Sequence, residues 1–92
     1  MRVIGYAADA EIVCKDCLRY PVGAYDREGN PVTPVTEDEE VDAPLHCGAC
    51  GAFLGGRLTA DGERYVRERV LRGDGRPEVL RAWREAYWYL FE

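Results

Sequence analysis

Cys14-Lys15-Asp16-Cys17 and Cys47-Gly48-Ala49-Cys50 decide the fold of this 92-residue chain, because they hold all four of its cysteines as two matched pairs. Two residues separate the cysteines of each pair, the spacing of a short loop that turns both thiols toward one metal ion. Two such loops place four thiolates in a tetrahedron, which is how zinc is bound in closed structural sites. The spacing therefore predicts one metal site with four ligands: Cys14, Cys17, Cys47 and Cys50.

The same four cysteines would form two disulfides in a secreted chain, so the compartment matters. The chain begins Met1-Arg2-Val3-Ile4, with no long apolar run and no cleavage site of small residues. We therefore expect neither a signal peptide nor a transmembrane helix, and we predict a soluble, cytoplasmic protein with no membrane partner. In a reducing cytoplasm, paired cysteines favour a metal over disulfides.

The predicted site is structural, because a dication keeps thiols deprotonated at neutral pH and four sulfurs exclude water from its inner shell. Catalytic zinc keeps a position open for water, and a chain with a single histidine has no evident Ser/His/Asp set. We therefore predict that the protein is not an enzyme. His46 lies beside Cys47, but with four cysteines present we interpret it as a neighbour of the site or a solvent-facing residue, not as a ligand.

Short β-favouring stretches dominate residues 1–56, which we call the metal half. One or two strands are expected between Arg2 and Cys14, and an extended return strand over Val32–Thr36. Between them, Asp26–Pro31 has the composition of a turn. The acidic run Glu37–Asp42 is expected to be a solvated loop, and Gly51–Leu54 a short strand after the second cysteine pair.

Residues 57–92, which we call the helical half, predict two helices. Thr59 is suited to cap the first helix and Gly73 to end it, while Pro77 is suited to the first position of the second. On the first helix, three oppositely charged pairs with i to i+4 spacing are expected to stabilise the exposed face: Glu63–Arg67, Arg64–Glu68 and Glu68–Arg72. The predicted fold class is thus α+β: a single domain over 1–92, with a small β half held together by a four-cysteine metal site and followed by two C-terminal helices.

The metal half resembles zinc ribbons and rubredoxins, in which two cysteine hairpins clamp one metal. The resemblance rests on the two pairs, on the 29 residues between Cys17 and Cys47, on Gly51 after the last cysteine, and on Tyr25-Asp26. It implies a rubredoxin-like metal site, with zinc as the cofactor or, alternatively, iron. Leu18 and Gly48 depart from rubredoxins, which usually carry glycine and proline there. Most of the chain also resembles small uncharacterised bacterial and phage zinc-ribbon proteins, which implies a shared fold and a metal but no activity.

Five aromatic residues within nine positions make the C-terminal end a candidate interaction surface. Most of them are expected to pack on the metal half and the first helix, because a small domain needs their area for its core. The alternative interpretation is that Trp88 or Tyr89, which lie off the main apolar stripe, forms a homodimer or partner surface. The set that we consider for this surface is Trp83, Tyr87, Trp88, Tyr89 and Phe91.

The formal net charge of −5 argues against general affinity for a polyanion, but the charge is unevenly placed. The metal half has four basic and ten acidic residues, whereas the helical half has eight arginines and seven acidic residues. An ion-paired helical surface is the favoured interpretation of these arginines. A groove that binds nucleic acid is the alternative, and it would use Arg57, Arg64, Arg67, Arg72, Arg76, Arg81 and Arg84.

These observations lead to one functional hypothesis with two alternatives. The hypothesis is a noncatalytic zinc-binding protein whose structural four-cysteine site supports a protein-interaction module. The first alternative is a zinc ribbon that binds nucleic acid through the C-terminal arginines, with an affinity that falls steeply with salt. The second is a rubredoxin-like iron protein that carries electrons.

Overall fold

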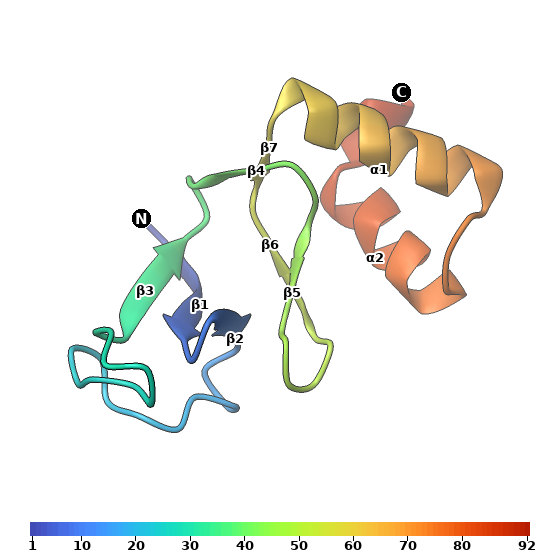
Figure 1. Ribbon diagram of the computed structural model, residues 1–92. Coiled ribbons are helices and arrows are strands. Elements are labelled where there is room, and N and C mark those ends of the chain that lie inside the picture. The colour runs from blue at the N-terminus through green and yellow to red at the C-terminus, as the bar shows by residue number, and fades with distance from the viewer.

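In the computed structural model, which covers residues 1–92, the chain starts with a tight β-hairpin (Figure 1). Strands β1 (Val3–Ala8) and β2 (Glu11–Val13) pair antiparallel. The two residues between them, Asp9 and Ala10, have φ angles of 51° and 62°. Left-handed conformations at both central positions match the right-handed twist of the flanking strands. The hairpin confirms the expectation of strands before the first cysteine pair.

Strand β3 (Thr33–Thr36) adds to the other edge of β1, which gives a three-stranded sheet in the order β2-β1-β3. It lies within the predicted return strand Val32–Thr36 and pairs antiparallel with β1. Successive residues of a strand point to opposite faces of the sheet. Ala8, Val13 and Val35 are buried, but not on one face, because Val13 pairs with Tyr6 whereas Val35 pairs with the neighbouring Gly5. The predicted turn at Asp26–Pro31 is also present, and it is closed by a hydrogen bond from the Asp26 N–H to the Asn30 carbonyl.

Two short pairs of strands connect this sheet to the helices. Strands β5 (Leu45–His46) and β6 (Phe53–Gly55) form an antiparallel hairpin, with the second cysteine pair in its loop. Strands β4 (Glu40–Val41) and β7 (Arg57–Leu58) pair in parallel. The prediction that the whole acidic run is a loop was therefore wrong at its end, because Glu40 and Val41 gain backbone partners in β7.

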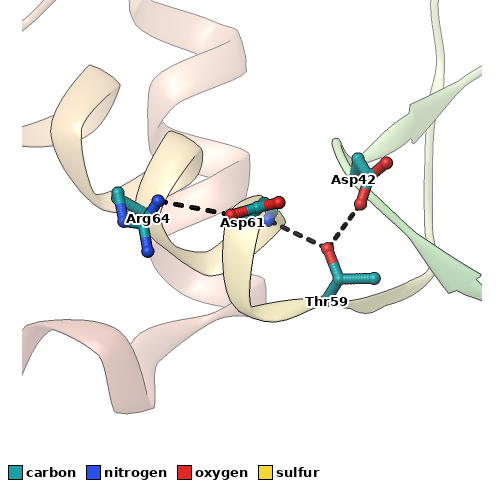
Figure 2. A network of polar contacts seen from close by, with 5 residues as sticks. Asp42, Thr59, Asp61 and Arg64 are labelled. Carbon is teal, nitrogen blue, oxygen red and sulfur yellow. Dashed lines mark hydrogen bonds and ion pairs between the residues drawn. The ribbon is translucent and has the colours of Figure 1, made fainter.

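Helix α1 (Ala60–Arg72) has the ends that the sequence predicts. The Thr59 side-chain oxygen accepts a hydrogen bond from the Gly62 backbone N–H at 3.1 Å, and its hydroxyl donates to Asp42 at 2.6 Å (Figure 2). The cap therefore also fastens the helix to the end of the acidic run. At the other end, Gly73 is left-handed with φ 67°, and its N–H donates to the last turn.

The ion pairs of the helical half differ from the predicted ones. No i to i+4 pair lies within salt-bridge distance on α1. Asp61 instead pairs with Arg64 at 3.2 Å, in the first turn and at i to i+3 spacing (Figure 2). The first turn favours this pair because an aspartate there also faces the positive end of the helix dipole. The other two ion pairs lie around the connection between the helices: Arg69–Asp74 and Arg76–Glu78.

Helix α2 (Pro77–Ala86) begins at the predicted proline but ends before the aromatic cluster does. Tyr87 leaves the helical region, with φ −113° and ψ 43°, and a short 3₁₀ helix, η1 (Trp88–Phe91), follows. One continuous helix cannot place all these rings on one apolar face. The break at Tyr87 turns Leu90 and Phe91 back toward the core, while Trp88 and Tyr89 stay outside.

The main apolar cluster lies where α1 and α2 pack on β6 and β7. Its buried members are Leu58, Val66, Trp83 and Tyr87. Phe53 and Val41, which belong to the metal half, pack against this cluster. The structure is thus α+β, with several short strands and two α-helices, and its core crosses the position where the metal half ends. No helix combines the length and the apolar character that crossing a membrane requires.

Candidate metal centre

Short strands deliver both cysteine pairs to one place. Cys14 directly follows β2, and Cys47 directly follows β5. Each pair sits in a tight turn: the Cys17 N–H donates to the Cys14 carbonyl at 3.1 Å, and the Gly51 N–H donates to the Cys47 carbonyl at 2.8 Å. The two turns are also tied together, because the Gly48 N–H donates to the Ile12 carbonyl of β2 at 2.8 Å.

The four sulfur atoms lie within 4.8 Å of one another. The Cys14 and Cys50 sulfurs, which come from different pairs, are 3.8 Å apart. A tetrahedron with zinc–sulfur bonds of about 2.3 Å has sulfur–sulfur edges of about 3.8 Å. None of the four cysteines is in a disulfide. The residues present therefore fit a metal ion held by four thiolates, and the structure brings together all four of the predicted ligands.

The backbone of the second pair points toward sulfur. The N–H groups of Ala49 and Cys50 both donate to the Cys47 sulfur at 3.4 Å. Such hydrogen bonds stabilise negative charge on sulfur and fix the orientation of the ligand. Gly51 closes the turn with φ 81°, a conformation that a residue without a β-carbon adopts at low cost.

The thiols perturb one another's ionisation. Backbone N–H groups, that of Cys14 first and then those of Cys50 and Ala49, lower the pKa of Cys47 to about 6 although burial opposes the shift. Hydrogen bonding with the thiols of Cys14, Cys50 and Cys47 raises the pKa of Cys17 to about 12. These opposite shifts favour the thiolate form of Cys47 and the protonated form of Cys17. A metal that binds all four sulfurs must displace the protons that the thiols still carry.

The cluster is buried on one side and open on the other. Cys47 is 3% exposed, Cys14 and Cys17 are half-buried, and Cys50 is exposed. Beside the open side lies a hollow lined mainly by apolar residues of β1 and β6, among them Ile4, Phe53 and Leu54. The metal position is thus reachable from solvent next to an apolar surface.

His46 uses both ring nitrogens in hydrogen bonds and is not among the residues that gather around the metal position. The indole N–H of Trp83 donates to Nε2 at 2.9 Å. Because Nε2 accepts, Nδ1 carries the proton and donates to the Gly51 carbonyl at 3.1 Å. The sequence indicated that His46 is no ligand. It gave no sign of Trp83 as a partner, because 37 residues separate the two.

The structure divides the predicted aromatic surface. Trp83 and Tyr87 are buried in the core and are not available to a partner, which corrects the set considered from the sequence. Trp88 and Tyr89 are 58% and 47% exposed and pack edge to face on each other. They are separate from the metal centre, and they form the exposed part of the cluster.

The arginines proposed for nucleic acid do not form one free set. Arg64 and Arg76 are engaged in ion pairs, and the guanidinium of Arg84 lies 5.3 Å from the centre of the Phe91 ring. The remaining members are exposed: Arg57, Arg67, Arg72 and Arg81.

Comparison of the chain with protein-family models, with curated proteins and with solved structures gave no match. The class to which we assign this protein therefore rests on its fold and on the geometry of the cysteine cluster. It is a small α+β protein with a four-cysteine cluster that can bind a metal ion.

Proposed function

We propose that this protein is a noncatalytic zinc-binding protein, in which a structural four-cysteine zinc site supports a protein-interaction module. The observation that carries the proposal is the geometry of the cluster, with four unbonded sulfurs within 4.8 Å of one another. Four thiolates complete the coordination of zinc and leave no position for a reacting water. The metal then contributes folding free energy, which a chain of this size needs.

The interaction surface of the module is formed by Trp88 and Tyr89. Large exposed aromatic side chains are common at protein interfaces, where they contribute much of the binding energy. The partner is a second copy of this chain or another protein. Zinc acts at a distance from this surface by holding the metal half, on which α2 packs through Phe53.

Metal analysis tests the first part of the proposal. Protein purified from its native host should contain one zinc ion per chain, and each single Cys→Ser substitution at the cluster should lower the bound zinc well below that value. Iron in place of zinc, with the colour of an iron tetrathiolate, would instead support the electron carrier. A zinc content that is unchanged in all four variants would overturn the site.

Sedimentation and capture experiments test the second part. The substitutions Trp88→Ala and Tyr89→Ala should abolish self-association or partner capture from the native host, while Tyr25→Ala, which removes a 71% exposed aromatic ring of the metal half, should not. A chain that stays monomeric over a wide concentration range and captures no protein would contradict the module. Binding of single-stranded or duplex nucleic acid that weakens steeply with salt would favour the arginine surface instead.

A further inference from the structure

His46 connects the second cysteine pair to the core of the helical half. It is the last residue of β5 and directly precedes Cys47. Its Nδ1 donates to the carbonyl of Gly51, on the far side of the cysteine loop, at 3.1 Å. Its Nε2 accepts the indole N–H of Trp83 at 2.9 Å. One side chain thus spans the metal-binding loop and α2.

Only two side-chain hydrogen bonds join the metal half to α2 or the residues after it. The other one runs from the Tyr87 hydroxyl to the Gly56 carbonyl, at 2.8 Å. Gly56 lies beyond β6, outside the cysteine loop. Trp83 is buried in the main apolar cluster, and its ring also lies 6.1 Å from that of His46. His46 therefore links the cysteine loop directly to the buried Trp83 by hydrogen bonds, beside the apolar contact that Phe53 makes with the same cluster.

We propose that His46 is a positioning residue that couples metal binding at the four thiolates to the packing of Trp83 in the helical half. The inference rests on the proposed function, because it requires that a metal orders the cysteine loop. A bound metal fixes Cys47 and Cys50 and so fixes the Gly51 carbonyl that holds the imidazole. The oriented imidazole then presents Nε2 to the indole. By thermodynamic reciprocity, loss of the indole partner must also weaken metal binding.

The two tryptophans of the chain provide a selective reporter. In a Trp88→Phe background Trp83 is the only tryptophan, so fluorescence excited where tyrosine does not absorb reports the surroundings of Trp83 alone. Removal of zinc by a chelator should change the emission of Trp83 in this background. When His46→Phe is added, zinc removal should leave the Trp83 emission nearly unchanged. Phenylalanine retains the ring that packs edge to face on Phe53, but it has neither ring nitrogen.

Two further substitutions separate the two hydrogen bonds. His46→Gln places an amide oxygen near the position of Nε2 and should restore part of the response of Trp83. His46→Asn places an amide N–H near the position of Nδ1, so it should keep the bond to Gly51 without restoring the response.

Metal affinity supplies a second readout. Trp83→Phe removes the indole donor together with part of the buried ring, and it should weaken zinc binding about threefold to tenfold although Trp83 is not a ligand.

Tyr87→Phe is the matched control. It removes the other side-chain hydrogen bond between the metal half and α2 or the residues after it, and it should destabilise the fold while leaving zinc affinity within about twofold of the wild type. If His46→Phe does not fold, Trp83→Phe and Tyr87→Phe still decide the question through their zinc affinities.

Equal zinc affinity in Trp83→Phe and the wild type would overturn the coupling, as would a Trp83 response that survives in His46→Phe. A wild-type chain that binds no zinc would overturn both the coupling and the proposed function, whereas tight zinc binding without a Trp83 response would overturn the coupling alone.

Discussion

Asp9 and Asp26 join the β1–β2 turn to the loop that follows the first cysteine pair. The Asp9 N–H donates to the Asp26 carboxylate at 2.8 Å, and the Arg27 N–H donates to the Asp9 carboxylate at the same distance. Tyr20 donates its hydroxyl to Asp9 as well. The bond from the Asp9 backbone, and next that from Asn30, lowers the pKa of Asp26. Two carboxylates thus order a stretch of chain that has little regular structure.

Substitution of Asp26 should loosen this loop. Asp26→Ala leaves the N–H groups of Asp9, Glu28 and Asn30 without their acceptor, so their amide exchange should become faster and the melting temperature should fall. The pKa of Asp26 in the folded state lies below its unfolded value of about 3.9. The stability that the Asp26 carboxylate contributes is therefore complete above about pH 3.9, and it is lost as the pH falls through the folded-state pKa. Unchanged exchange at Asn30 in the variant would contradict this role.

Asp9 and Ala10 are the two non-glycine residues with a positive φ. Unlike the Asp9 carboxylate, the methyl group of Ala10 cannot form a hydrogen bond that would offset the cost of this conformation. For an alanine, this φ of 62° costs about 1 to 2 kcal/mol. A glycine would avoid that cost, but it loses more conformational freedom on folding, which cancels part of the gain. Ala10→Gly should therefore raise the free energy of unfolding by about 0.5 to 1 kcal/mol in a urea titration. Ala7→Gly, in the interior of β1, is the control and should destabilise the fold.

At the scale of the elements, the second cysteine loop sets the pH dependence of metal binding. The lowered pKa of Cys47 favours its thiolate, whereas the raised pKa of Cys17 keeps that thiol protonated, so zinc must displace the proton of Cys17. Each displaced proton makes the apparent affinity rise about tenfold per pH unit. Zinc affinity measured by chelator competition should thus fall at least about a hundredfold from pH 7.5 to pH 5.5. At lower pH Cys47 becomes protonated as well, so zinc must also displace its proton and the slope should steepen. An affinity that does not depend on pH would exclude thiol ligands.

Helix α1 approaches β4 so closely that Gly62 has no room for a side chain. A β-carbon at this position would lie 2.9 Å from the Val41 carbonyl oxygen and 3.2 Å from the Asp42 backbone. Alanine is favoured over glycine within a helix by about 1 kcal/mol, but here the helix would have to move away from backbone atoms. Gly62→Ala should therefore lower the free energy of unfolding by about 1 to 2 kcal/mol. Arg67→Ala, on the exposed face of the same helix, should change it by less than about 0.5 kcal/mol.

The whole molecule is elongated, with extents of 42 × 23 × 19 Å, and the two ends are held in different ways (Figure 1). The three-stranded sheet has a small apolar core and lies next to the cysteine cluster. The helices share the larger apolar cluster with β6 and β7. Parallel pairing of β4 with β7 and the Tyr87–Gly56 hydrogen bond link the ends. Burial raises the pKa of Tyr87 to about 12, so its hydroxyl remains a donor at neutral pH.

Metal removal should therefore affect the two ends unequally. Chelation should increase amide exchange most in the cysteine loops and in β2, β5 and β6, because these segments carry or directly flank the metal ligands. Helix α1 should retain most of its protection, since its cap and its contacts with β4 and β7 do not involve the cluster. Far-ultraviolet circular dichroism and residue-resolved exchange measure this difference. A spectrum and an exchange pattern that do not change after complete metal removal would contradict the role of the metal in the fold.

The sequence by itself determined the features that depend on local chemistry. The spacing of the cysteines predicted all four members of the cluster, and Thr59, Gly73 and Pro77 predicted helix ends, because caps and turns depend on residues a few positions apart. Only the tertiary structure decided which aromatic rings are buried, that β4 pairs with β7, and that His46 bonds to Trp83. These contacts join residues far apart in the chain, and their geometry is fixed by how α1 and α2 pack on the β-strands, which no local pattern encodes.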